Sequence, residues 1–477
     1  MNRTRIAILL LTPLLLSFIL HIPYLQLDLI GIHVWRQTQT QTLVYNFVFR
    51  EHSIFFPQRF DLSSGTSLLF YEFPLYQWLI AQVDLLFGYS VLYSRLFSFL
   101  VFVFLYLGFY KWIRVYLRME LALLSAGFLC FSPILFYYCI NPLPDMLALC
   151  FGVWFLYFAT CFKKSRRNSQ LISAGLLLSL ATLVKLPFVL YGLILLPDFI
   201  TQFRKKKFGQ ALSQSLWILL LLIPALVWYV KAIPTWKHNG ITRGMLDNDK
   251  PIPVLLDYMW SHLVSNFPEL LTNYAAFPLV LAGIYYMMKN RVLKSVQYRH
   301  LILLTVFLVF YYFFEMNMIE KTHDYYLLPF IPLIFCVLAY GLKNLWSTRF
   351  RTWILVFILI APLTAWLRIH ERWNTEDPGF NKAFLTEQKN LQAIVPENAK
   401  CIVDFDDSRF IALYYLKRFG YSLFKNEINP DKLRFCYNKG ARFLITQNAN
   451  FKTSDFPEFQ MQKRYSGQLQ VYQLEKP

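Results

Sequence analysis

Charged side chains are scarce in this sequence. Asp, Glu, Lys and Arg make up 16% of its 477 residues, and 56% of the residues are hydrophobic. A soluble domain usually carries about 25% charged residues. Apolar runs of membrane-spanning length recur along most of the chain. The composition therefore excludes an ordinary soluble domain and predicts a polytopic α-helical membrane protein.

Several motifs of other function classes are missing as well. The sequence has no phosphate-binding glycine loop, no zinc-ligand spacing and no internal repeat. The net charge of +19 is typical of nucleic-acid binding. However, the basic residues form short clusters between apolar runs, as in the cytoplasmic loops of membrane proteins. We therefore expect no nucleic-acid partner.

Cysteine is also infrequent, with seven residues. Five of them lie in apolar segments and are interpreted as packing residues. Cys401 and Cys436 share the polar C-terminal region. They could form a disulfide if that region faces an oxidising compartment, and the sequence leaves this open.

The apolar runs predict about eleven transmembrane helices, starting with an uncleaved N-terminal span. The predicted spans are residues 6–25, 92–112, 121–139, 146–162, 171–184, 188–203, 213–230, 270–288, 301–314, 325–346 and 353–367. Residues 74–87 are too short for a span and predict a helix at the membrane interface. With the N-terminus inside, the Lys/Arg clusters fall inside and the loops 26–73, 231–269 and 315–324 fall outside.

The C-terminal region has a different pattern. Short apolar runs at 401–403, 443–445 and 471–474 predict strands, and residues 409–417 predict a helix. We therefore expect a transmembrane module over 1–368 and a small α/β domain outside the membrane over 369–477.

Polar residues that could do chemistry gather on the predicted outer side. They are Asp28, His33, Trp35, Arg36, Gln37, Gln39, Arg59, Asp61, Glu72, Asp145, Lys185, His323, Asp324 and Tyr325. Ionisable groups near lipid are costly, so such a cluster indicates function. Arg and Lys bind phosphate, and a carboxylate can act as a general base toward a hydroxyl. The cluster predicts transfer of a group from a lipid phosphate.

Each of these residues also has a structural interpretation. Trp35 could be an interfacial aromatic, and Arg59 and Asp61 could form a solvated pair. Asp145 could cap a helix, Lys185 could extend its ammonium to the interface, and His323 could be an ordinary loop residue.

Five short motifs occur in a fixed order. They are His33-Val34-Trp35-Arg36-Gln37, Glu72-Phe73-Pro74-Leu75-Tyr76 followed by Gly88 and Arg95-Leu96, Leu143-Pro144-Asp145, Leu183-Val184-Lys185-Leu186-Pro187, and His323-Asp324-Tyr325-Tyr326-Leu327-Leu328-Pro329. Through them, residues 5–345 resemble the GT-C membrane glycosyltransferases. The resemblance is to the bacterial relatives of protein O-mannosyltransferases (glycosyltransferase family 39-like) and of the lipid A aminoarabinose transferase.

The resemblance implies an inverting transfer of a hexose or pentose from a polyprenyl-phosphate-linked donor. The acceptor would be a glycolipid, glycan or protein on the periplasmic face of a bacterial inner membrane. By position, Arg36, Lys185, His323 and Tyr325 resemble phosphate-binding groups, and Glu72 and Asp145 the acidic positions.

One departure concerns the catalytic base. Relatives carry an early aspartate where this chain has His33 and Gln39. His33, Glu72, Asp145 or a displaced Asp28 could take the role, and a divalent metal stays open. A flippase of lipid-linked glycans and an inactive glycolipid-binding relative are the alternative functions.

Overall fold

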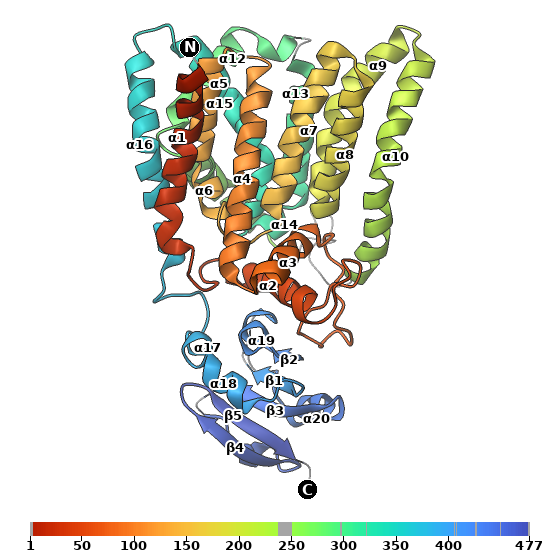
Figure 1. Ribbon diagram of the computed structural model, residues 1–477, viewed down its shortest axis with the longest axis vertical. Helices are drawn as coiled ribbons and strands as arrows, with labels where there is room; N and C mark the ends of the chain where they lie inside the picture. The colour runs from red at the N-terminus through yellow and green to blue at the C-terminus, as the bar shows by residue number, and fades with distance from the viewer. Residues whose placement is uncertain are drawn as a thin grey trace. The chain divides into compact units, whose positions relative to one another are not determined.

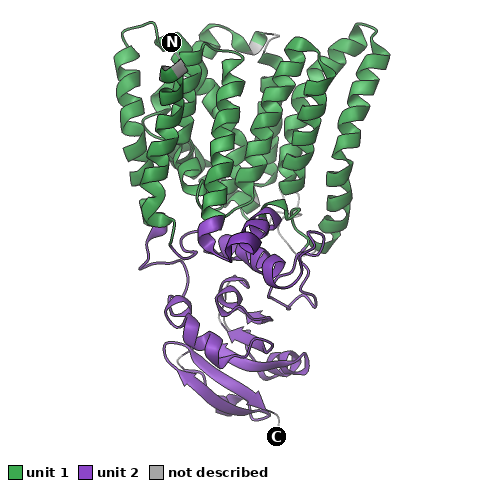
Figure 2. Ribbon diagram, in the orientation of Figure 1, with its two compact units in different colours: residues 1–26, 70–76, 94–371 green, residues 27–69, 77–93, 372–477 purple. Residues whose placement is uncertain are grey.

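The computed structural model describes residues 3–236, 250–295, 298–320, 322–404, 406, 408–424, 427–448 and 450–475. The centre of the predicted outer loop 231–269 lies outside the described residues. The chain forms two compact units, which interleave in the sequence (Figure 2). Unit 1 contains residues 1–26, 70–76 and 94–371, and unit 2 contains residues 27–69, 77–93 and 372–477.

Unit 1 is built of apolar helices (Figure 1). Among the described residues, 7 helical stretches are long and apolar enough to cross a membrane. They are Ile6–Tyr24, Val91–Arg114, Asp145–Ser165, Leu186–Arg204, Phe208–Trp236, Asp324–Leu345 and Arg351–Trp373. Shorter apolar helices accompany them, so the polytopic helical fold is confirmed, while the count of about eleven spans stays a prediction.

The α-helices of this part of the chain are regular over most of their length. Their bounds are α1 (Arg3–His21), α4 (Val91–Arg114), α5 (Met119–Cys130), α6 (Pro133–Tyr138), α7 (Asp145–Ser165), α8 (Asn168–Val184), α9 (Leu196–Arg204), α10 (Phe208–Ala232), α11 (Ile252–Ser261), α12 (Phe277–Lys289), α13 (Arg299–Phe314), α14 (Met316–Ile319), α15 (Ile331–Leu345) and α16 (Arg351–Ile369). Irregular helical segments join some of them: η1 (Ile22–Tyr24), η2 (Leu186–Leu195), η3 (Ile233–Trp236), η6 (His262–Leu271), η7 (Val292–Lys294), η9 (Asp324–Phe330) and η10 (His370–Trp373).

Proline breaks several of the predicted spans. The span expected over 121–139 is two helices, because Ser132 precedes Pro133 and adopts an extended conformation with ψ 119°. The spans expected from 188 and 325 begin as 3-10 segments that contain Pro187 and Pro329. A proline has no N–H to donate within a helix, so the chain can adopt other helical geometries there.

Unit 2 combines the first predicted outer loop with the C-terminal region. Two helices lie in or near that loop, α2 (Val34–Phe49) and α3 (Leu75–Phe87). The C-terminal region adds α17 (Ala383–Thr386), α18 (Gln388–Ile394), α19 (Ile411–Leu416), α20 (Pro430–Asn438) and η11 (Thr453–Asp455). Its strands are β1 (Lys400–Asp404), β2 (Gly420–Leu423), β3 (Ala441–Thr446), β4 (Gln460–Ser466) and β5 (Gln470–Glu475).

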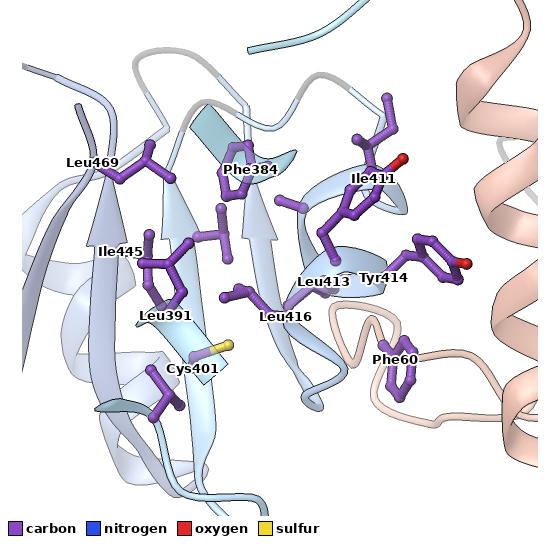
Figure 3. Close-up of a cluster of buried hydrophobic side chains, with 14 of the residues drawn as sticks. Phe60, Phe384, Leu391, Cys401, Ile411, Leu413, Tyr414, Leu416, Ile445 and Leu469 are labelled. Carbon is purple, nitrogen blue, oxygen red and sulfur yellow. The ribbon is translucent and has the colours of Figure 1, made fainter. Parts of the chain in front are cut away.

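The five strands form one mixed sheet in the order β2-β1-β3-β5-β4. β1 pairs in parallel with β2 and β3, and β5 pairs antiparallel with β3 and β4. One core covers the face of Cys401 and Ile445 and includes α19 (Figure 3). A second core covers the face of Ile402 and Leu444 and includes α20. The small α/β domain is confirmed, although the sequence pattern did not predict β2, β4 and α20.

The first outer loop contributes to the same core and sheet. Leu29, Val34 and Phe60 pack in the α19 core, and Figure 3 shows Phe60 near Leu416 and Tyr414. Leu62 N donates to Gly420 O at 2.8 Å, and Gly420 N donates to Phe60 O at 3.1 Å. This loop segment therefore extends the β2 edge, because it satisfies backbone groups that an edge strand would leave unpaired.

Cys401 and Cys436 are free thiols. They lie in the two cores on opposite faces of the sheet, so the disulfide left open by the sequence does not form. Burial raises the pKa of Cys401 to about 12 and that of Cys436 to about 11, which keeps both thiols protonated and unreactive.

Candidate active site

Asp145 and Lys185 form a buried ion pair in unit 1. α7 begins at Asp145, and α8 ends directly before Lys185. The two helices pack against each other, so the start of one meets the end of the other. Lys185 Nζ lies 2.8 Å from Asp145 Oδ1, and the two side chains are only 13% and 3% exposed.

The geometry argues against the two structural interpretations of this pair. The N-cap of α7 is Pro144, and no side chain forms a cap hydrogen bond there. The Lys185 ammonium turns to a buried carboxylate rather than outward to an interface. Asp145 Oδ2 is buried and accepts no hydrogen bond within the part of the chain that the structure describes. A buried polar atom without a partner is costly and suits a ligand contact.

Two neighbouring tyrosine rings lie close to the ammonium of Lys185. Its Nζ lies 5.4 Å from the ring centroid of Tyr325 and 4.9 Å from that of Tyr326. Both rings belong to η9, whose 3-10 geometry contains Pro329. Cation–π attraction adds to the ion pair and holds the ammonium in place.

The neighbouring residues of the motif are fixed by hydrogen bonds. The Tyr138 hydroxyl of α6 donates to Asp324 Oδ1. His323 Nδ1 lies 2.7 Å from the carbonyl oxygen of Met318, and its ring centroid lies 5.9 Å from that of Tyr325. The structure thus brings together Asp145, Lys185, His323, Asp324 and Tyr325.

Glu72 lies on a segment beside that of Lys185. Phe73 N donates to Leu183 O at 3.1 Å, and Trp228 Nε1 donates to Tyr71 O at 3.0 Å. Phe73 also packs in a cluster with Leu183 and Trp228. The Glu72 side chain is half-buried.

Arg95 supports the turn that leads to Asp145. It is fully buried, and its Nη1 donates to Ile140 O at 3.3 Å and to Asn141 Oδ1 at 3.1 Å. The sequence placed Arg95 in a motif but not among the candidate site residues. Because it holds the turn, we assign it a positioning role.

Glu315 is a further candidate site residue that the sequence analysis did not single out. It directly follows α13, and burial raises the pKa of its carboxyl to about 7, while the positive charge of Lys185 acts in the opposite direction. A signal existed, because Glu315 is an acid at the end of an apolar helix in the loop that carries His323.

The other predicted residues of the first outer loop belong to unit 2. His33, Arg36, Gln37 and Gln39 are buried at the start of α2. Arg36 donates to Gln39 Oε1, and Gln37 Nε2 donates to Ile30 O at 3.1 Å. Polar side chains that are buried together in this way must satisfy one another or a ligand.

Three further candidates, Asp28, Arg59 and Asp61, also lie in unit 2. Asp28 is exposed. Asp61 is 2% exposed and accepts hydrogen bonds from Ser63 and from Ser422 N, so it is not part of a solvated pair. Arg59 donates to Ser64 Oγ within the same loop.

No metal-binding group stands out among the described residues. Within those ranges, no three His, Cys, Asp or Glu side chains are arranged to hold an ion.

Part of the chain is similar to a known protein family. The family model of the dolichyl-phosphate-mannose-protein mannosyltransferases matches residues 72–228, which contain Glu72, Arg95, Asp145 and Lys185. A search of curated proteins finds no match.

Solved structures share the fold over nearly the whole chain. ArnT from Cupriavidus metallidurans bound to undecaprenyl phosphate superposes with a TM-score of 0.69 at 10% identity, covering 99% of this chain and 98% of that chain. Its apo form gives a TM-score of 0.66 at 10% identity over 98% of this chain and 97% of that chain. The oligosaccharyltransferase from Archaeoglobus fulgidus, in complex with Zn and sulfate, gives 0.61 at 15% identity over 98% of this chain and 73% of that chain. The match and the shared fold confirm the resemblance to GT-C membrane glycosyltransferases and support a glycosyltransferase with this fold.

Proposed function

We propose that this protein is an inverting glycosyltransferase of a bacterial inner membrane. It transfers a sugar from a polyprenyl-phosphate-linked donor to an acceptor on the periplasmic face. The main support is the buried Asp145–Lys185 pair, whose ammonium lies close to two tyrosine rings. The fold shared with ArnT, which was crystallised with undecaprenyl phosphate, adds to it.

Lys185 binds the donor phosphate, with His323 and Tyr325 as the further phosphate-side groups of unit 1. Negative charge builds on the phosphate as the bond to the sugar breaks. A preorganised ammonium in a site of low polarity stabilises that charge more than water does. Charge-assisted hydrogen bonds from Lys185 to Asp145 and to a phosphate oxygen are compatible, since the ammonium has three donors.

A carboxylate serves the acceptor. An acceptor hydroxyl attacks the sugar carbon on the face opposite the phosphate, its proton passes to a carboxylate, and the phosphate leaves with the bonding electrons. Asp145 has a buried oxygen without a partner among the described residues, and Glu72 lies on the adjacent segment. We favour Glu72 over His33 and Asp28 as the base, because the pairing of Asp145 with Lys185 places Asp145 on the phosphate side, where it orients the ammonium.

The test is transfer from a radiolabelled polyprenyl-phosphate sugar in proteoliposomes. We expect Glu72→Gln or Asp145→Asn to abolish transfer while the protein still inserts. Asp198→Asn is the matched control, because it breaks the Arg166–Asp198 pair of 2.8 Å near the other end of α7. Full activity in both site variants would refute the assignment.

The same assay separates the alternatives. Movement of lipid-linked glycan across the membrane without sugar transfer would favour a flippase. Donor binding without turnover would favour an inactive relative. Mass spectrometry of surface glycolipids from cells with and without the protein would identify the sugar and the acceptor by their mass difference.

A further inference from the structure

Unit 2 contains a cavity of about 460 Å³ that the proposed reaction does not use. Its lining comes from the start of α2, the segment around α17, the loops after β1 and β3, and the start of α19. A volume of this size falls in the range of about 300–1,000 Å³ that small-molecule sites occupy.

The cavity lies where the sheet topology favours ligand binding. The chain passes from β1 through α19 to β2 on one side, and from β2 through α20 to β3 on the other side of β1. The two helices cover opposite faces of the sheet. The carboxyl ends of β1 and β3 therefore form a switch point, at which open α/β sheets bind their ligands.

Amides and carboxylates from separate segments are held in place around this point. Asn381 Nδ2 donates to Gln447 Oε1 at 2.7 Å, and Thr446 Oγ1 donates to Asp404 Oδ2 at 2.9 Å. Asp406 is 5% exposed and accepts hydrogen bonds from the Ser408 hydroxyl at 2.8 Å and from its backbone N–H at 3.1 Å. Fixed polar groups of this kind give a pocket its specificity.

Aromatic rings form the apolar part of the lining. Trp35 and Phe380 are partly exposed and line the cavity. Phe380 stacks on Tyr415 with 5.2 Å between ring centroids and 17° between ring planes, so its orientation is fixed. Of the described residues that line the cavity, none is Lys, Arg or His, and Asp406 is acidic. These features disfavour a phosphate and favour a neutral ligand with both hydroxyl groups and apolar faces.

We infer that this cavity binds a neutral sugar of the acceptor. That the sugar belongs to the acceptor rests on the proposed function, whereas the binding of a neutral sugar rests on the cavity alone. Sugar hydroxyls pair with the amide groups of Asn381 and Gln447, and the apolar face of the ring packs on Trp35 or Phe380.

The test is saturation-transfer NMR on the full chain in nanodiscs, with glucose, galactose and N-acetylglucosamine as probes and glucose 6-phosphate as the charged comparison. We expect a saturation-transfer signal from at least one neutral sugar. The signal should be at least about fivefold weaker in Asn381→Ala and Gln447→Ala, since each variant removes a hydrogen bond to the ligand. Gln462→Ala, on the exposed side of β4, is the matched control and retains the signal.

The inference would be overturned if no neutral sugar gave a saturation-transfer signal, or if all three variants gave equal signals. A stronger signal from glucose 6-phosphate than from the neutral sugars would also overturn it. In the transfer assay, Gln447→Ala should raise the acceptor KM about fivefold and leave the donor KM unchanged. Sugar binding that depends on Gln447 without any transfer activity would refute the enzyme and retain the site. Sugar transfer by Gln447→Ala with an unchanged acceptor KM would refute the sugar site and retain the enzyme.

Discussion

Lys185 concentrates the chemical interest of unit 1 at the residue scale. It pairs with Asp145, faces two tyrosine rings and acts on the charge of Glu315. Breaking such a buried pair by removing one partner typically costs about 3–5 kcal/mol, because the other charge remains buried. A single substitution therefore affects stability as well as function, and an experiment must separate the two.

The Lys185 variants separate them. We expect Lys185→Met to lower kcat/KM by at least about 100-fold, because the leaving phosphate loses its cation. The protein should also lose stability, because Asp145 becomes an uncompensated charge. The double variant Lys185→Met/Asp145→Asn should regain stability and stay inactive, as measured by thermal unfolding in detergent and by the transfer assay.

Lys164→Met is the control for loss of a lysine. Its ammonium donates to the Val115 carbonyl at 2.6 Å, near the end of α7 that does not carry Asp145. A double variant with normal transfer would show that the pair has only a structural role.

Glu315 predicts a pH dependence. Burial raises its pKa to about 7, so the group is neutral below that pH and becomes a carboxylate above it. The new charge near Lys185 competes with the donor phosphate, so the donor KM should rise as the pH increases through about 7. The stability that the protonated form provides decreases as the pH rises from the unfolded-state pKa of about 4.5 to the folded-state pKa of about 7, because the unfolded chain binds fewer protons over that range.

Glu315→Gln should remove both effects. We expect a donor KM that no longer changes between about pH 6 and pH 8 in the transfer assay. Glu320→Gln, in the same loop and paired with Lys250, is the matched control. The same pH profile in Glu315→Gln as in the wild type would assign the titration to another group.

At the scale of elements, the site lies where helices end. Asp145 starts α7, Lys185 follows α8, and Tyr325 lies in the 3-10 segment before α15. Prolines near these positions interrupt regular hydrogen bonding. The position of each functional side chain thus depends on how closely its helix packs against the next one.

Two glycines set the packing of α15 against α12. A Cβ on Gly283 would lie 2.2 Å from Val337 O, and one on Gly341 would lie 2.1 Å from Leu279 O. We expect Gly283→Ala or Gly341→Ala to force the helices apart, destabilise the protein by at least about 1–3 kcal/mol and reduce transfer. Thermal unfolding and the transfer assay measure the two effects.

Gly209→Ala in α10 is the control, because its Cβ would meet no atom within 4 Å. It should unfold at or above the wild-type temperature, since alanine favours a helix over glycine. Wild-type stability in both α12 and α15 variants would contradict the close approach.

At the scale of the whole molecule, the charges of the loops predict an orientation. Basic clusters at 163–167, 204–207 and 289–299 belong on the cytoplasmic side by the positive-inside rule. An alkaline phosphatase fused after Lys206 should therefore be inactive, and one fused after Pro477 should be active, since the enzyme needs an oxidising compartment to form its disulfides. Activity at the first position alone would reverse the topology.

The sequence predicted the polytopic class and many helix positions, because length and apolarity alone decide whether a segment suits a membrane. It also identified Asp145, Lys185 and Tyr325 as candidates, through motifs with proline beside polar residues. It did not predict the broken helix at Ser132 or the role of Glu315, because neither local pattern differs from that of an ordinary span or loop.

Contacts between distant segments were decided only by the tertiary structure. The Asp145–Lys185 pair and the cavity between Trp35 and Gln447 each join residues far apart in the chain. Packing also places Cys401 and Cys436 in different cores. The periodicity of a sequence reports which faces are apolar, but not which surface each of them meets. The sequence alone thus determined that this protein is a membrane protein of helices with a small α/β domain, and packing determined which of its polar groups meet.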